Sequence, residues 1–123
     1  MTIMGAINHI DAVKPNGYSQ DEKVRWLSTL DGVIKAEIID THEGAEDVVF
    51  NEYNENTPLE QALLVPHPYD DVYVKWLEAQ IDYANGEYGK YNNSITMYNA
   101  AYSAFEKHYN RVNRPIRKKF IHF

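Results

Sequence analysis

The spacing of apolar residues along the chain predicts a protein built from helices. Ile3, Ile7 and Ile10 recur at steps of four and three, which is the spacing of one face of a helix. Thr2 is suited to cap the start of this helix, which we expect to run to Val13. A proline and an Asn-Gly pair follow in residues 14–17, and they favour a turn that ends the helix.

A second helix is predicted over residues 20–40. Ser19 and Glu22 are spaced as in a capping box, in which each side chain satisfies a free backbone amide at the start of the helix. Asp31 and Lys35 stand four residues apart, acid before base, so we expect them to pair on the helix surface. The apolar stripe of this helix comprises Trp26, Leu27, Leu30, Val33, Ile34 and Ile38.

Residues 41–68 break the helical pattern and form an acidic, irregular insertion. Residues 48–50 are long enough only for a short strand. Residues 57–60 have the capping pattern of one or two helical turns that would end before Pro66. A connection of 28 residues is long, and long ordered loops are often contact surfaces.

The second half of the chain predicts two more helices. Pro68, Asp70 and Asp71 suit the start of one helix, and Asn85-Gly86 suits its end. In the last helix, apolar and aromatic residues recur at steps of three and four over more than three heptads. This seam comprises Tyr88, Tyr91, Ile95, Tyr98, Tyr102, Phe105, Tyr109 and Val112. Because each tyrosine hydroxyl needs a partner or water, we expect a partly hydrated contact between helices.

These elements predict an all-α fold in a single domain, residues 1–123. We expect a small helical bundle with two short-to-medium N-terminal helices, the acidic insertion, and a long C-terminal helical hairpin or kinked helix. The length is typical of one domain, and an apolar content of 44% excludes wholesale disorder. Residues 114–123 form a basic tail too short for a core of its own, so we expect it to dock on its own domain or on a neighbour.

Charge divides the chain into acidic and basic parts. The chain has 18 acids and 12 bases, but residues 36–74 hold ten acids and no Lys or Arg, while residues 107–123 hold six bases and no acid. Exposed segments of opposite charge can steer a partner. The candidate partner-binding residues are therefore Glu43, Glu46, Asp47, Arg111, Arg114, Arg117, Lys118 and Lys119.

No motif in the chain predicts catalysis, a metal or a cofactor. There is no cysteine, and residues 42–46 place a glutamate where a zinc-protease motif needs its second histidine. Glu78 and Asp82 lie four apart, but such acids usually line a wet surface beside a base such as Lys75. No apolar run approaches the roughly 20 residues of a membrane span, and the first residues lack the features of a signal peptide. We therefore expect no enzyme activity, no cofactor, no metal and no membrane partner.

Residues 69–111 resemble proteins from the structural gene cluster of Firmicutes prophages, and these proteins resemble the small head–tail connectors of tailed phages. The likeness extends over most of residues 1–115 and is carried by YDDVYVKWLEAQIDYANGEY (69–88), KYNNS (90–94), YNAAY (98–102) and YNR (109–111). Members of that family are small α-helical proteins that assemble as a ring beneath the portal, usually of twelve copies. The resemblance implies a structural virion protein that contacts itself, the portal and tail proteins. It places the protein in the bacterial cytoplasm during phage assembly and then in the virion neck.

Two other kinds of function stay open at this point. A DNA-associated phage or regulatory protein could bind the phosphate backbone through the basic tail, without sequence specificity. An enzyme would require a deep pocket with converging titratable groups.

The opposite charges at separate places in the sequence favour the connector, because they suit a head-to-tail contact between subunits, which closes into a ring.

Overall fold

Four α-helices make up most of the part of the chain that the computed structural model describes, residues 1–116. They are α1 (Ile3–Val13), α2 (Gln20–Glu37), α3 (Asp71–Ala84) and α4 (Tyr88–Val112), with two 3-10 turns, η1 (Ile39–Thr41) and η2 (Ala45–Asp47). No β-strand forms within these residues, where only two isolated antiparallel bridges occur. The predicted all-α fold is confirmed.

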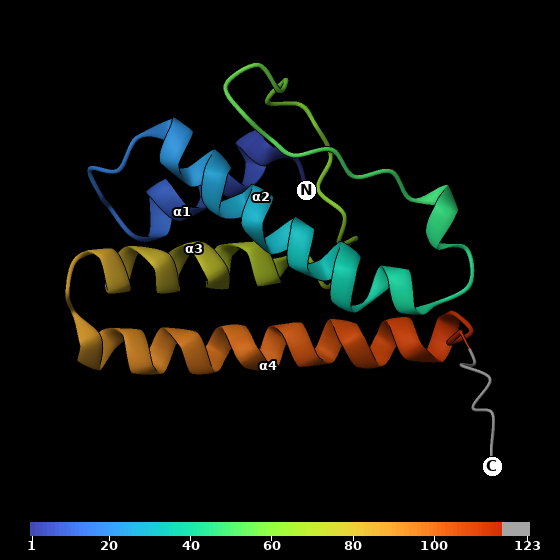
Figure 1. Cartoon of the computed structure of the whole chain (residues 1–123). Helices are drawn as coiled ribbons and strands as arrows, with labels where there is room; N and C mark the ends of the chain where they lie inside the picture. Colours follow the sequence, from blue (N-terminus) through green and yellow to red (C-terminus); the bar gives the residue numbers. More distant parts are fainter. Residues whose placement is uncertain (117–123) are drawn as a thin grey trace, which may run out of the picture.

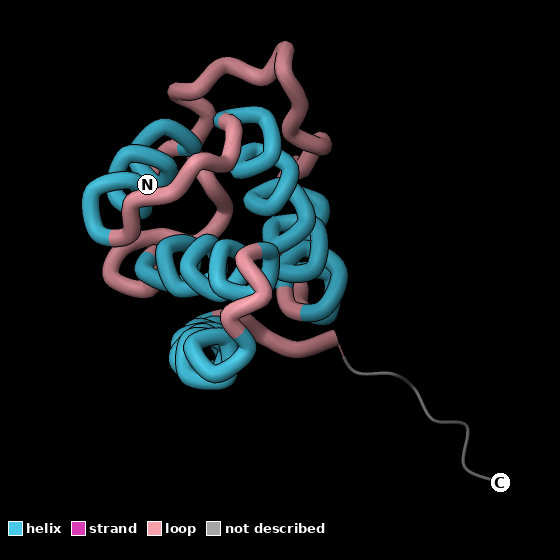
Figure 2. The backbone as a smooth tube through the Cα atoms, turned by 90° about the vertical axis from the view of Figure 1, so that its left-hand side faces the viewer, coloured by secondary structure: helices cyan, strands magenta, loops and turns pink. Residues whose placement is uncertain are grey.

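Helix α3 lies at the centre of the arrangement and packs against α1, α2 and α4. α3 and α4 run antiparallel as a hairpin, and α4 forms an outer layer below α3 (Figure 1). Figure 2 shows α4 nearly end-on, at the edge of the molecule. The chain breaks between the two helices rather than kinking, because Gly86 has a φ of 73°, which glycine adopts without strain.

The predicted starts of the first two helices are confirmed by their caps. The Thr2 side-chain oxygen accepts a hydrogen bond from the Gly5 amide at 3.0 Å, and the Ser19 hydroxyl accepts one from the Glu22 amide at 3.1 Å. Helix α2 ends at Glu37, earlier than predicted, and η1 continues the chain as a tighter turn. Helix α3 begins after Pro68, at Asp71.

Residues 48–66 contain neither of the elements that the sequence suggested. Residues 48–50 form no strand, and no helix follows Thr57. The Thr57 hydroxyl accepts a hydrogen bond from the amide of Asn54, which precedes it in the chain, so it does not cap a following helix. The following backbone pairs instead with the start of α1, where the Ile3 amide donates to the Gln61 carbonyl at 3.0 Å.

The seam of α4 faces α3 along its middle but not at its ends. Tyr98 and Phe105 are buried, whereas Tyr88 and Val112 are each 61% exposed. The Tyr98 ring packs 4.9 Å from that of Trp76 on α3, and burial raises the pKa of Tyr98 to about 12. Half-buried residues of the seam are Tyr91, Ile95, Tyr102 and Tyr109. One of these hydroxyls, that of Tyr102, donates to the Glu37 carboxylate at 2.7 Å.

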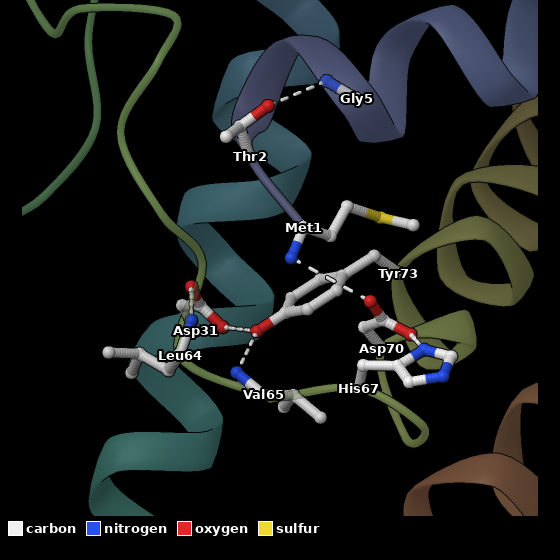
Figure 3. A network of polar contacts seen from close by, with 9 residues as sticks. All are labelled: Met1, Thr2, Gly5, Asp31, Leu64, Val65, His67, Asp70 and Tyr73. Carbon is white, nitrogen blue, oxygen red and sulfur yellow. Dashed lines mark hydrogen bonds and ion pairs between the residues drawn. The ribbon is translucent and has the colours of Figure 1, made fainter.

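A buried carboxylate, that of Asp31, joins α2, α3 and the irregular segment (Figure 3). The Tyr53 and Tyr73 hydroxyls each donate to it at 2.6 Å, and the Leu64 amide donates at 3.1 Å. The Tyr73 hydroxyl in turn accepts from the Val65 amide at 2.7 Å. The Tyr53 and Tyr73 hydroxyls and the Leu64 amide would each lose a partner if the carboxylate were removed, so these polar contacts help to hold a segment that has no helix or strand.

The predicted surface pair of Asp31 and Lys35 is wrong. Asp31 is fully buried, and Lys35 pairs with Asp40 beyond the end of α2. Spacing on a helix brings two residues to one side, but it does not show which side the rest of the fold covers.

The pH dependence of stability tests the Asp31 site. Burial raises the pKa of Asp31 above the ordinary value of 3.8, so the folded carboxyl binds its proton more tightly than the unfolded one. Between pH 3.8 and the higher pKa of the folded state, the contribution of Asp31 to the free energy of unfolding therefore falls as pH rises. The fall is at most about 1.4 kcal/mol per pH unit. Because Asp31→Asn does not titrate, we expect the stability of the wild type relative to this variant to fall with pH through that window. Denaturant unfolding of both proteins at several pH values measures the difference. If the stability of the wild type relative to the variant instead rose with pH, the three hydrogen bonds would lower the pKa of Asp31 by more than burial raises it.

Truncation of the seam tests the packing of α4. Tyr98→Ala removes a buried ring from between Trp76 and Tyr102, and we expect a loss of roughly 3 kcal/mol in the free energy of unfolding. Met97→Ala changes a side chain on the same turn that is 53% exposed and should change stability by less than about 0.5 kcal/mol. Equal effects of the two changes in thermal or denaturant unfolding would contradict the packing of Tyr98 against α3.

Candidate functional site

The acidic partner-binding candidates lie on the turns that follow α2. Glu43, Glu46 and Asp47 all have exposed side chains, and Glu46 and Asp47 belong to η2. Gly44 has a φ of 87°, a left-handed conformation that lets the chain turn from η1 into η2. This sharp turn presents three carboxylates on one short stretch of surface.

One of the basic candidates, Arg114, lies directly beside this acidic turn. Arg111 and Arg114 are exposed at the end of α4, and Arg117, Lys118 and Lys119 lie outside the described residues. After α4 the chain runs antiparallel to residues 41–43. The Glu43 amide donates to the Arg114 carbonyl at 2.8 Å, and the Ile116 amide donates to the Thr41 carbonyl at 2.9 Å. Segments of opposite charge that are far apart in the sequence are therefore neighbours within one chain.

A buried histidine, His42, connects the acidic turn to α4. Its Nδ1 lies 2.6 Å from the Ile38 carbonyl, and its Nε2 lies 2.7 Å from the side-chain oxygen of Asn110. The ring also meets that of Tyr109 edge-on, with centroids 4.8 Å apart. The sequence placed His42 in the acidic, irregular insertion, and no local pattern distinguishes this buried histidine from an exposed one. Within residues 1–116, no three His, Asp or Glu side chains gather closely enough to hold a metal ion.

An apolar groove of about 220 Å³ lies at the same end of the molecule. One wall is the last two turns of α4, and the opposite wall comes from η1 and the irregular segment. The side chain of His108 in this groove stacks on Tyr69, with ring centroids 4.5 Å apart. The lining residues are Ile39, Val48, Leu64, Pro66, Phe105, His108, Tyr109, Val112 and Asn113. We call the acidic turn together with Arg111 and Arg114 at the end of α4 the charged turn. The groove and the charged turn together form a surface that the sequence did not predict, because the walls of the groove come from four separate segments.

The opposite end of α4 carries an exposed tyrosine cluster. Tyr83 and Tyr88, on either side of the hairpin turn, are 58% and 61% exposed. The Tyr83 ring lies 5.8 Å from that of Tyr88 and 5.2 Å from that of Tyr91, in edge-on geometry. The spacing of three and four places Tyr88 and Tyr91 in the packing seam, but no pattern in the sequence shows that the turn adds Tyr83 to them.

The acid pair Glu78 and Asp82 does not form the wet surface that the sequence suggested. Asp82 is 1% exposed, and its carboxylate lies 2.7 Å from the ammonium of Lys14, just after α1. The contact is an ion pair between a buried carboxylate and a partly exposed ammonium. The ion pair of Lys14 with Asp82 connects the end of α1 to the hairpin of α3 and α4, so the role of Asp82 is structural.

Comparisons with known proteins return no match: no family model fits the chain, and neither a curated protein nor a solved structure is similar to it. Among residues 1–116, no helix combines the length and apolar character that crossing a bilayer requires.

Charge reversal tests whether the charged turn acts between molecules. Glu43, Glu46 and Asp47 changed together to Lys should weaken self-association, and Arg111→Glu with Arg114→Glu should do the same. The combined variant should partly recover association, because complementarity returns with exchanged signs. Sedimentation velocity at several salt concentrations measures this, since exposed charges are screened over roughly 10 Å at 0.1 M salt.

Thermal unfolding of the same variants is the control. Exposed charges that interact only within the chain would shift unfolding by up to about 1 kcal/mol and leave association unchanged. That result would assign the charged turn an intramolecular role.

Proposed function

We propose that this protein is an assembly subunit that associates head to tail into a ring, as in the head–tail connectors of tailed phages that residues 69–111 resemble. In this role it would join a portal to a tail, in the bacterial cytoplasm during assembly and in the virion neck afterwards. The proposal rests on that resemblance together with the distribution of surfaces along α4.

The observation that carries the proposal is that the two ends of α4 present different kinds of surface. Tyr88 is the first residue of α4 and Val112 the last, so the two ends lie roughly 36 Å apart. One end carries the exposed tyrosine cluster, and the other carries the apolar groove and the charged turn. A contact between unlike surfaces is heterologous, and repeated heterologous contacts close into rings when the rotation allows it.

The chemistry of the tyrosine cluster suits a protein interface. Tyrosine is enriched at the centres of interfaces because its ring buries a large apolar area while its hydroxyl stays hydrogen-bonded. Tyr83 and Tyr88 already contact each other edge-on, so binding would order a pair of rings that are packed together beforehand.

The charged turn favours a protein partner over DNA. Arg111 and Arg114 are exposed, as phosphate contacts require, but Glu43, Glu46 and Asp47 lie on the adjoining stretch. Carboxylates beside the arginines repel phosphates and lower the counterion-driven affinity for nucleic acid. A surface with both signs suits a protein that presents the opposite arrangement.

The association of the purified protein tests the proposal. We expect sedimentation velocity to show concentration-dependent oligomers and electron microscopy to show ring-shaped particles, with or without a co-expressed prophage portal protein. Tyr83→Ser with Tyr88→Ser should weaken association at least about tenfold, because hot-spot tyrosines contribute 2 kcal/mol or more, and should leave folding intact.

Met97→Ser is the matched control, since it removes a side chain of comparable exposure from the middle of α4. A protein that stays monomeric at all concentrations and does not bind portal or tail proteins would contradict the proposal. Binding to DNA that falls steeply with salt would instead support a nucleic-acid role.

A further inference from the structure

The apolar groove at the end of α4 lies next to the point where the described chain ends. Val112 and Asn113 line the groove, and three residues later Ile116 is hydrogen-bonded to Thr41. Val112 and Ile116 are 61% and 52% exposed, so the apolar surface of the groove continues outward. A monomer leaves this surface in contact with water, which is unfavourable for side chains of this size.

We propose that the groove of one copy binds residues 117–123 of a second copy. This inference rests on the proposed self-association and adds a second contact to it, at the groove end of α4. The segment has the sequence RKKFIHF, in which three bases precede three large apolar side chains. Seven residues span at most about 23 Å when extended, which is enough to cross from the surface of one subunit into an adjoining groove.

The apolar half of the segment matches the walls of the groove. Phe120, Ile121 and Phe123 have large apolar side chains, whose removal from water is favourable. The walls offer aliphatic side chains from Val48 and Leu64 together with aromatic rings from α4.

The basic half of the segment matches the charge beside the groove. Asp40, Glu43, Glu46 and Asp47 are all exposed on the stretch that leads from η1 to the wall residue Val48. A segment whose apolar residues occupy the groove would place Arg117, Lys118 and Lys119 beside these carboxylates. Such complementarity fixes the direction of the bound segment and speeds association.

The direction of the chain favours a second copy over the same copy. Beyond the groove residue Asn113 the backbone is extended and runs along residues 41–43, so a return to its own groove requires a reversal within the next few residues. Residues 117–123 contain no Gly, Pro, Asn, Asp or Ser, the residues that make tight turns. Entry into a neighbouring groove requires no reversal.

Two variants of the whole protein test the proposal by sedimentation velocity. A chain that ends at Ile116 should keep the thermal stability of the full chain but associate at least tenfold more weakly. Val112→Lys should do the same, because it places a charged side chain in the groove and repels the basic segment. A lysine in the last turn of a helix suits folding, so this variant should remain folded. The matched control is Met97→Lys, which adds the same charge to an exposed site on α4 outside the groove.

Direct binding of the segment completes the test. A fluorescent peptide of residues 117–123 should bind the chain that ends at Ile116 and should bind its Val112→Lys variant at least tenfold more weakly, as measured by anisotropy. A peptide with Phe120, Ile121 and Phe123 replaced by Ser should show the same loss.

Three outcomes would overturn the inference, and they separate it from the proposed function. If the full chain associates and truncation does not weaken association, assembly stands but uses another contact. If the full chain is monomeric and excludes a peptide that the truncated chain binds, the segment occupies its own groove. If the full chain is monomeric and neither chain binds the peptide, both the contact and self-association fail.

Discussion

The hydrogen bonds to the buried carboxylate of Asp31 determine where the irregular segment lies. Residues 48–66 have no helix or strand to satisfy their backbone, yet the segment lies against α2 and leads to the start of α3. Burying a carboxylate costs free energy, and the hydroxyls of Tyr53 and Tyr73 with the Leu64 amide offset that cost. Because these donors come from α3 and from two places in the irregular segment, one side chain on α2 holds together parts of the chain that are up to 42 residues apart.

This site also accounts for the central place of α3. Tyr73 is fully buried and connects α3 to Asp31 on α2 and to the Val65 amide of the irregular segment. The opposite side of α3 is covered by α4, which leaves α4 with one packed face and one hydrated face. A helix covered on only one side can extend beyond its partners. Both of its ends are therefore accessible, and they carry the tyrosine cluster and the groove.

The sequence predicted the helices well because helix signals are local. The caps at Thr2 and Ser19, the steps of three and four in α4 and the break at Gly86 depend on residues within one or two turns. The partners of Asp31 and His42 were missed because they lie up to 42 and 68 residues away. For the candidate surface, charge alone was visible in the sequence. The adjacency of its acidic and basic parts required the backbone pairing at Arg114.

Buried polar groups fix both walls of the groove before any ligand binds. Leu64 contributes its side chain to one wall, and its amide is held by Asp31. On the other wall, the last turns of α4 are held by the contacts of His42 with Asn110 and Tyr109. A groove with fixed walls loses little conformational entropy on binding, so more of the free energy of apolar burial is available for affinity. The polar core thus acts beyond folding, because loosening the bonds at Asp31 would weaken the groove even though Asp31 does not line it.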